Sequence, residues 1–290
     1  MLGQHPQLYG FPELNLFVTD TIAELLELGN SSAPGGCSYT TGLLRVIAEL
    51  KFGGQTELTI KSAIDWISSR SQWTTKQMLD QLLEWILPRI GLDKSPRTAL
   101  SRQALDRALT GYPSSRIIHL TRHPVSTLRS LQENHARFGT GAAVSRDAVW
   151  LLNFYARIWV QSQELILSVV RELGPRQALH VRAEELLTLP DKSLRAISEW
   201  LELRSEPHVI EVMKHPERSA YARPAPMGLD GDGDPSFLKS PNLRIPIVSQ
   251  LLDIPSEWKL EPGITDKIND LSYRLGYGTF SDNDTDISNN

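Results

Sequence analysis

One stretch of the sequence combines a cation and hydroxyls in a pattern that suits an anion. In "RIIHLTRHPVSTLRS" (116–130), an apolar, β-branched run leads to Arg122, Pro124 follows, and Ser126 and Ser130 come at helical spacing. Proline is favoured in the first turn of a helix, where free N–H groups attract anions. A guanidinium with two hydroxyls at such a helix start could hold a phosphate. A surface arginine followed by capping serines would give the same pattern, and both interpretations stay open at this point.

Two further residues could supply a base and a second cation. Glu13 lies in the largely apolar segment "HPQLYGFPELNLF" (5–17), a setting that suits a general base. Lys94 lies in "GLDKSPRTAL" (91–100), beside Ser95 and Pro96. Taken singly, a solvated acid and a loop lysine are the more ordinary interpretations of these two residues.

Other common sites are opposed by the sequence. No G-x-x-x-x-G-K-[ST] loop is present, and the calcium-loop opening "DGDGD" (230–234) is followed by Pro235 where a glycine is required. Cys37 is the single cysteine, which rules out an intrachain disulfide and a cysteine metal site. We therefore expect no metal.

The composition is that of an ordinary globular protein. The chain has 290 residues, 40% of them hydrophobic and 22% charged, and its net charge is −4. The absence of a basic excess argues against nucleic acid as a partner. Because the sequence has neither a signal peptide nor a run of 18 apolar residues, we expect a cytoplasmic protein with no membrane partner.

The elements that must position these residues follow from periodicity. "RIIHLTR" is typical of a buried strand, the segment 177–186 repeats the pattern of a strand followed by an acidic turn, and strands separated by helices predict a parallel α/β fold. Helices are expected at 19–28 (with Thr19 or Asp20 as the cap), at 40–51, at 56–73, in a segment ended by Pro88 and Gly91, after Pro124, and at 148–173. Residues 5–18 are expected to be irregular, and 222–242 to form a loop.

In chain order these motifs resemble the sulfotransferase superfamily. More narrowly, they are similar to the sulfotransferase domains of bacterial polyketide and olefin biosynthesis, and less closely to the tyrosylprotein sulfotransferases. The chain keeps the family's "HP" eight residues before a glutamate, its lysine in a "DK-S/T-P" setting, and its strand-end arginine eight residues before a serine. "ALHVRAEELL" (178–187) and "GDPSF" (233–237) look like two further family segments.

The resemblance implies a fold and a reaction. The fold would be a three-layer parallel sheet of the P-loop nucleotide kinase and sulfotransferase type, with one domain over 1–279, a helical acceptor-side insertion at 19–90 and a disordered tail at 280–290. The reaction would transfer a sulfonate from 3′-phosphoadenosine-5′-phosphosulfate (PAPS) to a hydroxyl on a carrier-bound acyl chain or small metabolite, or, as a second choice, on a tyrosine.

The resemblance also implies roles for single residues. Glu13 would take the acceptor's proton, and Lys94 would neutralise charge on the departing phosphate oxygen. Arg122 and Ser130, with Ser126 beside them, would hold the donor's 3′-phosphate. Two further contacts to the nucleotide are expected from Lys239 and Ser240.

The chain departs from the family at its start. The family's first strand, its "PRSGTT" loop and most of the following helix have no counterpart before His5. Either Met1 is an internal methionine of a longer protein, which the coherent downstream motifs favour, or the gene has decayed. We expect this polypeptide alone to be weakly active or inactive, and less stable than its relatives because strand edges would be exposed. A non-catalytic scaffold is the alternative function, and a nucleotide kinase is opposed by the missing Walker lysine.

Overall fold

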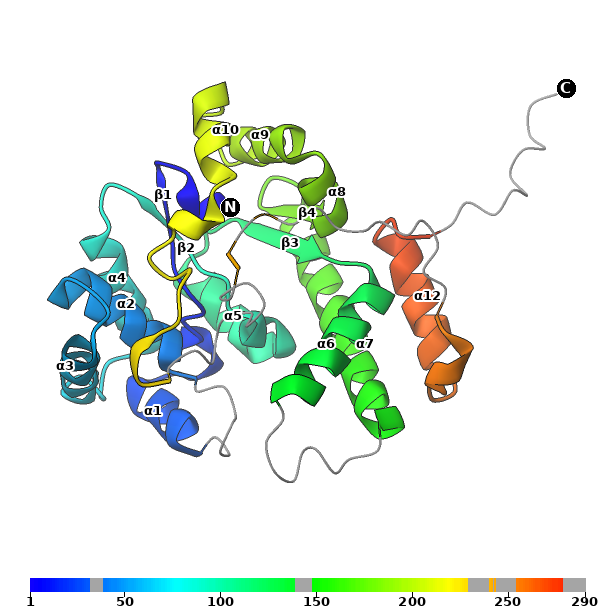
Figure 1. Ribbon diagram of the computed structural model, residues 1–290, viewed down its shortest axis with the longest axis horizontal. Coiled ribbons are helices and arrows are strands. Elements are labelled where there is room, and N and C mark those ends of the chain that lie inside the picture. The colour runs from blue at the N-terminus through cyan, green and yellow to red at the C-terminus, as the bar shows by residue number, and fades with distance from the viewer. Residues whose placement is uncertain (32–38, 139–147, 229–239, 242, 244–253, 279–290) are drawn as a thin grey trace, which may run out of the picture. The chain divides into compact units, whose positions relative to one another are not determined.

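The computed structural model describes residues 1–31, 39–138, 148–228, 240, 241, 243 and 254–278 (Figure 1). The chain divides into two compact units. The first unit comprises Met1–Arg116 with Glu185–Ile245, and the second comprises Ile117–Glu184 with Pro246–Asn290. The tail expected at 280–290 and most of the loop expected at 222–242 lie outside the described residues.

The strands of the first unit are short. β1 (Leu8–Gly10) and β2 (Ile90–Leu92) pair in parallel, with Leu8 opposite Ile90 and Gly10 opposite Leu92. The expectation that 5–18 is irregular is therefore wrong for Leu8–Gly10, and the helix expected before Pro88 ends earlier, at Trp85. Three-residue strands leave no periodic signal, because it is the pairing of distant segments that forms them.

Helices make up most of the first unit. They are α1 (Ile22–Ser31), α2 (Thr41–Phe52), α3 (Glu57–Ser68), α4 (Thr75–Trp85), α5 (Arg102–Gly111), α9 (Pro190–Trp200) and α10 (Pro207–Met213). Short 3₁₀ turns lie at η1 (Leu2–Gln4), η2 (Leu16–Val18), η3 (Pro96–Leu100), η5 (Pro216–Arg218) and η6 (Pro226–Gly228). Leucine, isoleucine and methionine side chains of η2 and α1–α4 form a core without solvent exposure, among them Leu16, Leu25, Ile47, Ile60, Met78 and Leu82.

The starts of these helices show where local sequence rules succeed. α3 and α4 begin with capping boxes, at Thr56 with Thr59 and at Thr74 with Gln77. The cap predicted for the first helix is wrong. Thr21 caps it instead, because the Glu24 amide donates to the Thr21 hydroxyl and the Glu24 carboxylate accepts from the Thr21 amide.

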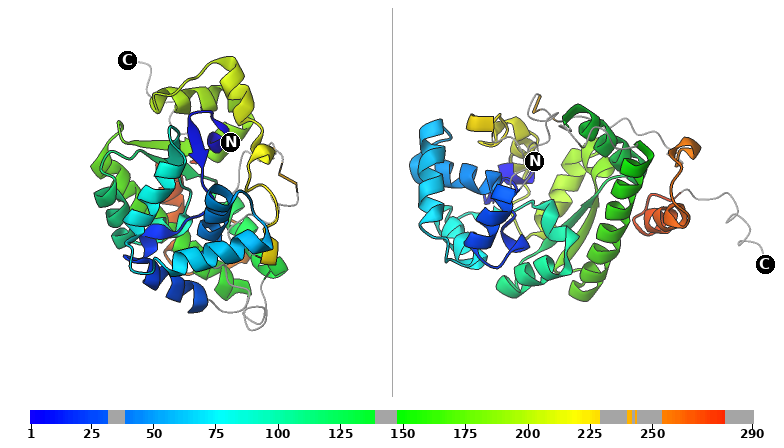
Figure 2. Two further views of the ribbon diagram at one scale, coloured as in Figure 1. Left: turned by 90° about the vertical axis from the view of Figure 1, so that its left-hand side faces the viewer. Right: turned by 90° about the horizontal axis from the view of Figure 1, so that it is seen from below.

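The second unit contains the two predicted strands. β3 (Ile117–Thr121) and β4 (Ala178–Arg182) are parallel, with Ile117 opposite Ala178 and Thr121 opposite Arg182. The helices are α6 (Pro124–Phe138), α7 (Ala148–Leu173) and α12 (Ile264–Arg274), with η7 (Ser256–Trp258); α8 (Ala183–Thr188) begins at the end of β4. α7 contacts both strands on one side, and α6 and α12 pack against α7 (Figure 2). The positions of both strands and of the long helix at 148–173 are confirmed, but the expectation that the strands are buried is wrong, because most of their residues are half-buried or exposed and Leu120 is 55% exposed.

The strands confirm the parallel α/β class that the sequence predicts. Among the described residues they form two separate two-stranded sheets, β1–β2 and β3–β4, so that each strand has one hydrogen-bonded partner. Within the ranges that the structure describes, no helix is both long and apolar enough to cross a membrane.

Candidate active site

Glu13 and Lys94, expected to act together, are in direct contact. Glu13 lies shortly after the carboxyl end of β1, and Lys94 lies shortly after the carboxyl end of the adjacent parallel strand β2. The Lys94 Nζ forms an ion pair with Glu13 Oε1. The Glu13 side chain is only 15% exposed, whereas that of Lys94 is 69% exposed. The Glu13 carboxylate is therefore largely buried in the first unit, whereas the Lys94 side chain that contacts it is largely exposed to solvent.

Hydrogen bonds join the two loops that carry this pair. The Asn15 amide donates to Ser95 Oγ at 2.9 Å, and the Ser95 hydroxyl and the Leu14 amide both donate to Asp93 Oδ1, at 2.9 and 3.3 Å. Although Asp93 as a residue is exposed, the protein around its carboxyl group desolvates it and raises its pKa to about 6, against the effect of these hydrogen bonds. Neither Asp93 nor Ser95 carries a predicted role, and their position beside Lys94 is the only signal of one in the sequence.

The first turn of α2 packs directly on the backbone of Glu13. A Cβ atom added to Gly42 would lie 2.1 Å from the Glu13 carbonyl oxygen, well inside van der Waals contact. Only a glycine at position 42 leaves room for this approach. Gly42 is thus a residue of the candidate site that sequence reasoning missed.

Arg122 lies where the sequence predicts it, directly after β3. Its side chain is exposed and makes no ion pair or side-chain hydrogen bond with any residue that the structure describes. Ser126 and Ser130 are half-buried and one helical turn apart on α6, which begins at Pro124. The structure therefore places Arg122 between β3 and α6 and the two serines in the first two turns of α6, and no described residue neutralises the guanidinium.

The start of α6 is less open than the sequence predicts. His123 Nδ1 accepts a hydrogen bond from the Val125 amide at 3.3 Å, and the Thr127 amide donates to the His123 carbonyl oxygen at 2.9 Å. Burial lowers the pKa of His123, which favours the neutral ring that this cap requires. The Val125 amide, which was expected to be free, is thus already bonded, whereas the bond of the Thr127 amide is the first ordinary bond of the helix.

The last two predicted contacts are only partly described. Ser240 is half-buried and belongs to the first unit, whereas Lys239 lies outside the described residues.

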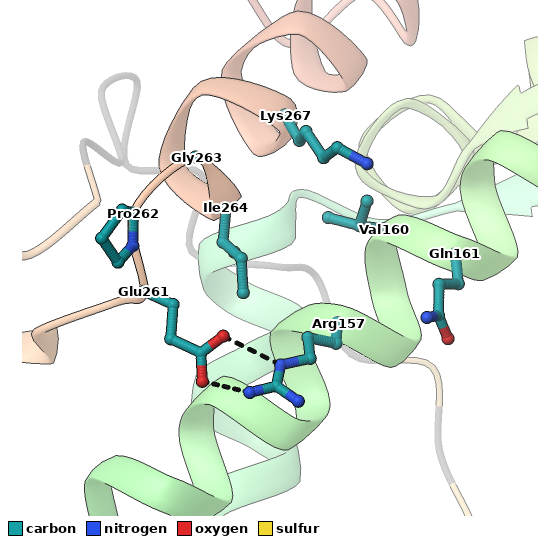
Figure 3. A pocket seen from close by; sticks show the side chains of 8 residues that line it. All are labelled: Arg157, Val160, Gln161, Glu261, Pro262, Gly263, Ile264 and Lys267. Carbon is teal, nitrogen blue, oxygen red and sulfur yellow. Dashed lines mark hydrogen bonds and ion pairs between the residues drawn. The ribbon is translucent and has the colours of Figure 1, made fainter.

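A surface pocket of about 240 Å³ in the second unit contains none of these residues. It lies between α7 and the start of α12 (Figure 3). Its arginine, Arg157, donates to both carboxylate oxygens of Glu261, and its lysine, Lys267, is paired with Glu164 at 3.2 Å. Because both cations are already neutralised, the pocket is a weaker candidate for an anionic ligand than the turn at Arg122.

Charged side chains follow the carboxyl ends of the parallel strands, which is the position where α/β proteins commonly bind ligands. More narrowly, the chain belongs to the sulfotransferase family, whose sequence profile matches residues 1–207. The sulfotransferase domain from the curacin biosynthetic pathway has a similar fold, with a TM-score of 0.69, 22% identity, and coverage of 95% of this chain and 91% of that domain.

The sulfotransferase domain of the Synechococcus PCC 7002 olefin synthase is similar to the same degree. Its TM-score is 0.67 at 23% identity, over 96% of this chain and 88% of that domain. No curated protein sequence matches the chain. These likenesses confirm the predicted family and the predicted fold.

Proposed function

We propose that the protein is a PAPS-dependent sulfotransferase that acts on a hydroxyl group. The observation that carries the proposal is the contact between Glu13 and Lys94 at the ends of two adjacent parallel strands. An in-line transfer needs a base at the acceptor oxygen and a cation at the leaving oxygen, on opposite sides of the transferred group, and Glu13 and Lys94 bring these two kinds of side chain to one place.

In the proposed reaction, Glu13 accepts the proton of the acceptor hydroxyl. The acceptor oxygen then forms a bond to sulfur while the bond between sulfur and the bridging phosphate oxygen breaks, and the electron pair stays on that oxygen. Lys94 stabilises the negative charge that develops there. Its largely exposed side chain can leave Glu13 when the acceptor hydroxyl takes its place.

The residues around Arg122 fit the 3′-phosphate of PAPS. Arg122 has no carboxylate partner among the described residues, and a guanidinium is well suited to bidentate phosphate binding. Ser126 and Ser130 would add hydroxyl donors from α6, and Lys239 and Ser240 would contact the nucleotide.

The acceptor is proposed from the origin of the two proteins that have a similar fold. Both similar structures come from biosynthetic systems, the curacin pathway and an olefin synthase. We therefore propose a hydroxyl on a carrier-bound acyl chain or a small metabolite as the acceptor.

Calorimetric titration with adenosine 3′,5′-bisphosphate tests the donor site. We expect binding by the wild-type chain and a loss of about 10- to 100-fold in affinity in Arg122→Ala, because a charged hydrogen-bonded pair is removed. Arg129→Ala, an exposed arginine on the helix α6 that follows Arg122, is the matched control and should bind normally.

Three other results would contradict or limit the proposal. A chain that binds no bisphosphate would favour a non-catalytic scaffold. Preference for ATP with magnesium would indicate a kinase. Binding of the bisphosphate without transfer of labelled sulfonate from PAPS to any hydroxyl acceptor would limit the proposal to its donor site, which is the outcome expected if this polypeptide alone is inactive.

A further inference from the structure

The carboxylate of Glu184 connects two segments that are far apart in the sequence. Glu184 lies just after β4, in α8. Its Oε1 accepts a hydrogen bond from the backbone amide of His123 at 2.8 Å, and its Oε2 accepts one from the Tyr277 hydroxyl at 3.0 Å. His123 is the residue directly after Arg122, so this carboxylate fixes the backbone on one side of the arginine.

Tyr277 fixes the other side of the same arginine. Its hydroxyl lies 3.0 Å from the Oγ1 of Thr121, the residue directly before Arg122, and its ring meets the His123 ring edge-on at 5.4 Å between centroids. The Tyr277 amide donates to the Ser272 carbonyl oxygen at 2.7 Å, which anchors the tyrosine to the end of α12.

The donors and acceptors of this network allow its hydrogen bonds to run in one direction only. A carboxylate only accepts, so the Tyr277 hydroxyl donates to Glu184 and accepts from the Thr121 hydroxyl. The Thr121 oxygen then accepts from His180 Nε2–H, 2.8 Å away on β4. Burial raises the pKa of Tyr277, so its hydroxyl stays protonated and the chain of hydrogen bonds stays intact.

We propose that Glu184 and Tyr277 are positioning residues of the anion site, which aim the Arg122 guanidinium by holding the residues on both sides of it. The proposal rests on the proposed function, in which that anion is the donor's 3′-phosphate. It extends the site to the C-terminal part of the chain, because the family match ends at residue 207 and Tyr277 lies beyond it.

The same network could serve stability alone, and ligand selectivity separates the two roles. A loss of stability lowers the affinity of the second unit for every ligand to a similar extent. Misplacement of Arg122 lowers the affinity only for ligands that carry a 3′-phosphate. The informative quantity is therefore the ratio of affinities for adenosine 3′,5′-bisphosphate and adenosine 5′-monophosphate.

The experiment compares the wild-type chain with Tyr277→Phe, Glu184→Gln and the control Tyr273→Phe. Tyr273 lies on α12 and is exposed, so its variant should behave as wild type. We expect each test variant to bind the bisphosphate about 5- to 20-fold more weakly, as for one lost hydrogen bond to a charged group, with monophosphate affinity changed less than about twofold. An equal loss for both nucleotides would overturn the proposal in favour of a structural role.

Failure of this inference differs from failure of the proposed function. If Arg122→Ala weakens the bisphosphate and the two test variants do not, positioning is wrong and the donor site stands. If Arg122→Ala has no effect, the donor site itself is wrong. Hydrogen exchange of the His123 amide gives a readout without nucleotide, because Glu184→Gln should speed its exchange, and unchanged exchange would show that the bridge does not hold this turn.

Discussion

Glu13 and Lys94 lie 81 positions apart in the sequence, yet their side chains form an ion pair. If they are the base and the cation of the reaction, removal of either should slow transfer without unfolding the chain. We expect Lys94→Ala and Glu13→Gln each to lower kcat by about 10²- to 10³-fold, which steady-state assays with PAPS would measure. Lys76→Ala removes an exposed lysine from another ion pair and should leave kcat unchanged. A loss of less than threefold in both test variants would assign the pair a structural role.

At Gly42, substitution by alanine should change stability in the direction opposite to the usual one. An alanine in a helix normally stabilises by about 0.5–1 kcal/mol relative to glycine. At position 42 the new methyl group would meet the Glu13 carbonyl oxygen at 2.1 Å, so Gly42→Ala should destabilise by about 1–3 kcal/mol and displace the carboxylate.

Denaturant titration and kcat would both report the effect of Gly42→Ala. Gly111→Ala at the end of α5 is the control, because the nearest atoms to its added Cβ lie at 3.8 Å, an ordinary contact. If the two variants are equally stable, the close packing of α2 on Glu13 is wrong.

The residues of the candidate site differ in how far the sequence alone could locate them. Arg122 follows directly from local pattern, since an apolar β-branched run, a cation and a proline are neighbours in the chain. The contact between Glu13 and Lys94 does not, because it depends on the pairing of two strands that have no periodic signal. The roles of Glu184 and Tyr277 could not be predicted from the sequence either, because their hydrogen bonds link residues more than 60 positions apart.

At the scale of elements, long periodic segments were predicted best. The helix at 148–173 has the predicted ends, because a full apolar stripe faces the core of the second unit. The segment 56–73 was expected to be one helix, but α3 ends at Ser68, and the chain turns there to let the Trp73 and Ser71 carbonyl oxygens accept from the amides of Ile22 and Ala23. Tertiary hydrogen bonds of this kind override local helix preference.

The packing of β3 against α7 predicts a pH dependence. His119 is buried, its Nε2 lies 2.8 Å from Gln163 Oε1 on α7, and burial lowers its pKa from 6.5 to about 4. Between these values the unfolded chain takes up a proton that the folded chain does not. The free energy of unfolding should therefore fall as pH drops from 6.5 to 4, by about 3 kcal/mol from this group, and be unaffected by it above pH 7.

His119→Gln isolates that contribution. The glutamine amide can still donate to Gln163, but it does not titrate. Urea denaturation at about pH 7 and about pH 5 should show a smaller loss of stability in the variant than in the wild type. The pKa values of His123 and His180 are lowered as well, so part of the dependence should remain. An identical loss in both proteins would contradict the burial of a neutral His119.

At the scale of the whole molecule, two hydrophobic cores organise the chain. One is built by η2 and α1–α4 of the first unit, and the other by α6, α7 and α12 of the second. Each core supports one of the two sheets whose strand ends carry the candidate residues. The family profile covers the first core and the strands of both units, whereas α12, which completes the second core, follows the matched region.

Within the part of the chain that the structure describes, the strands pair two by two and each keeps one edge without a strand partner, which has a consequence for the behaviour of the protein at high concentration. Backbone amides and carbonyls along an unpaired strand are a template for another chain, and natural proteins usually guard such borders with lysine or proline. β3 instead presents Leu120, which is 55% exposed. We expect concentrated solutions to self-associate, and Leu120→Lys to suppress the rise in light scattering, with the exposed Leu58→Lys as a comparison that should not. Equal scattering from all three proteins would mean that this border is already protected.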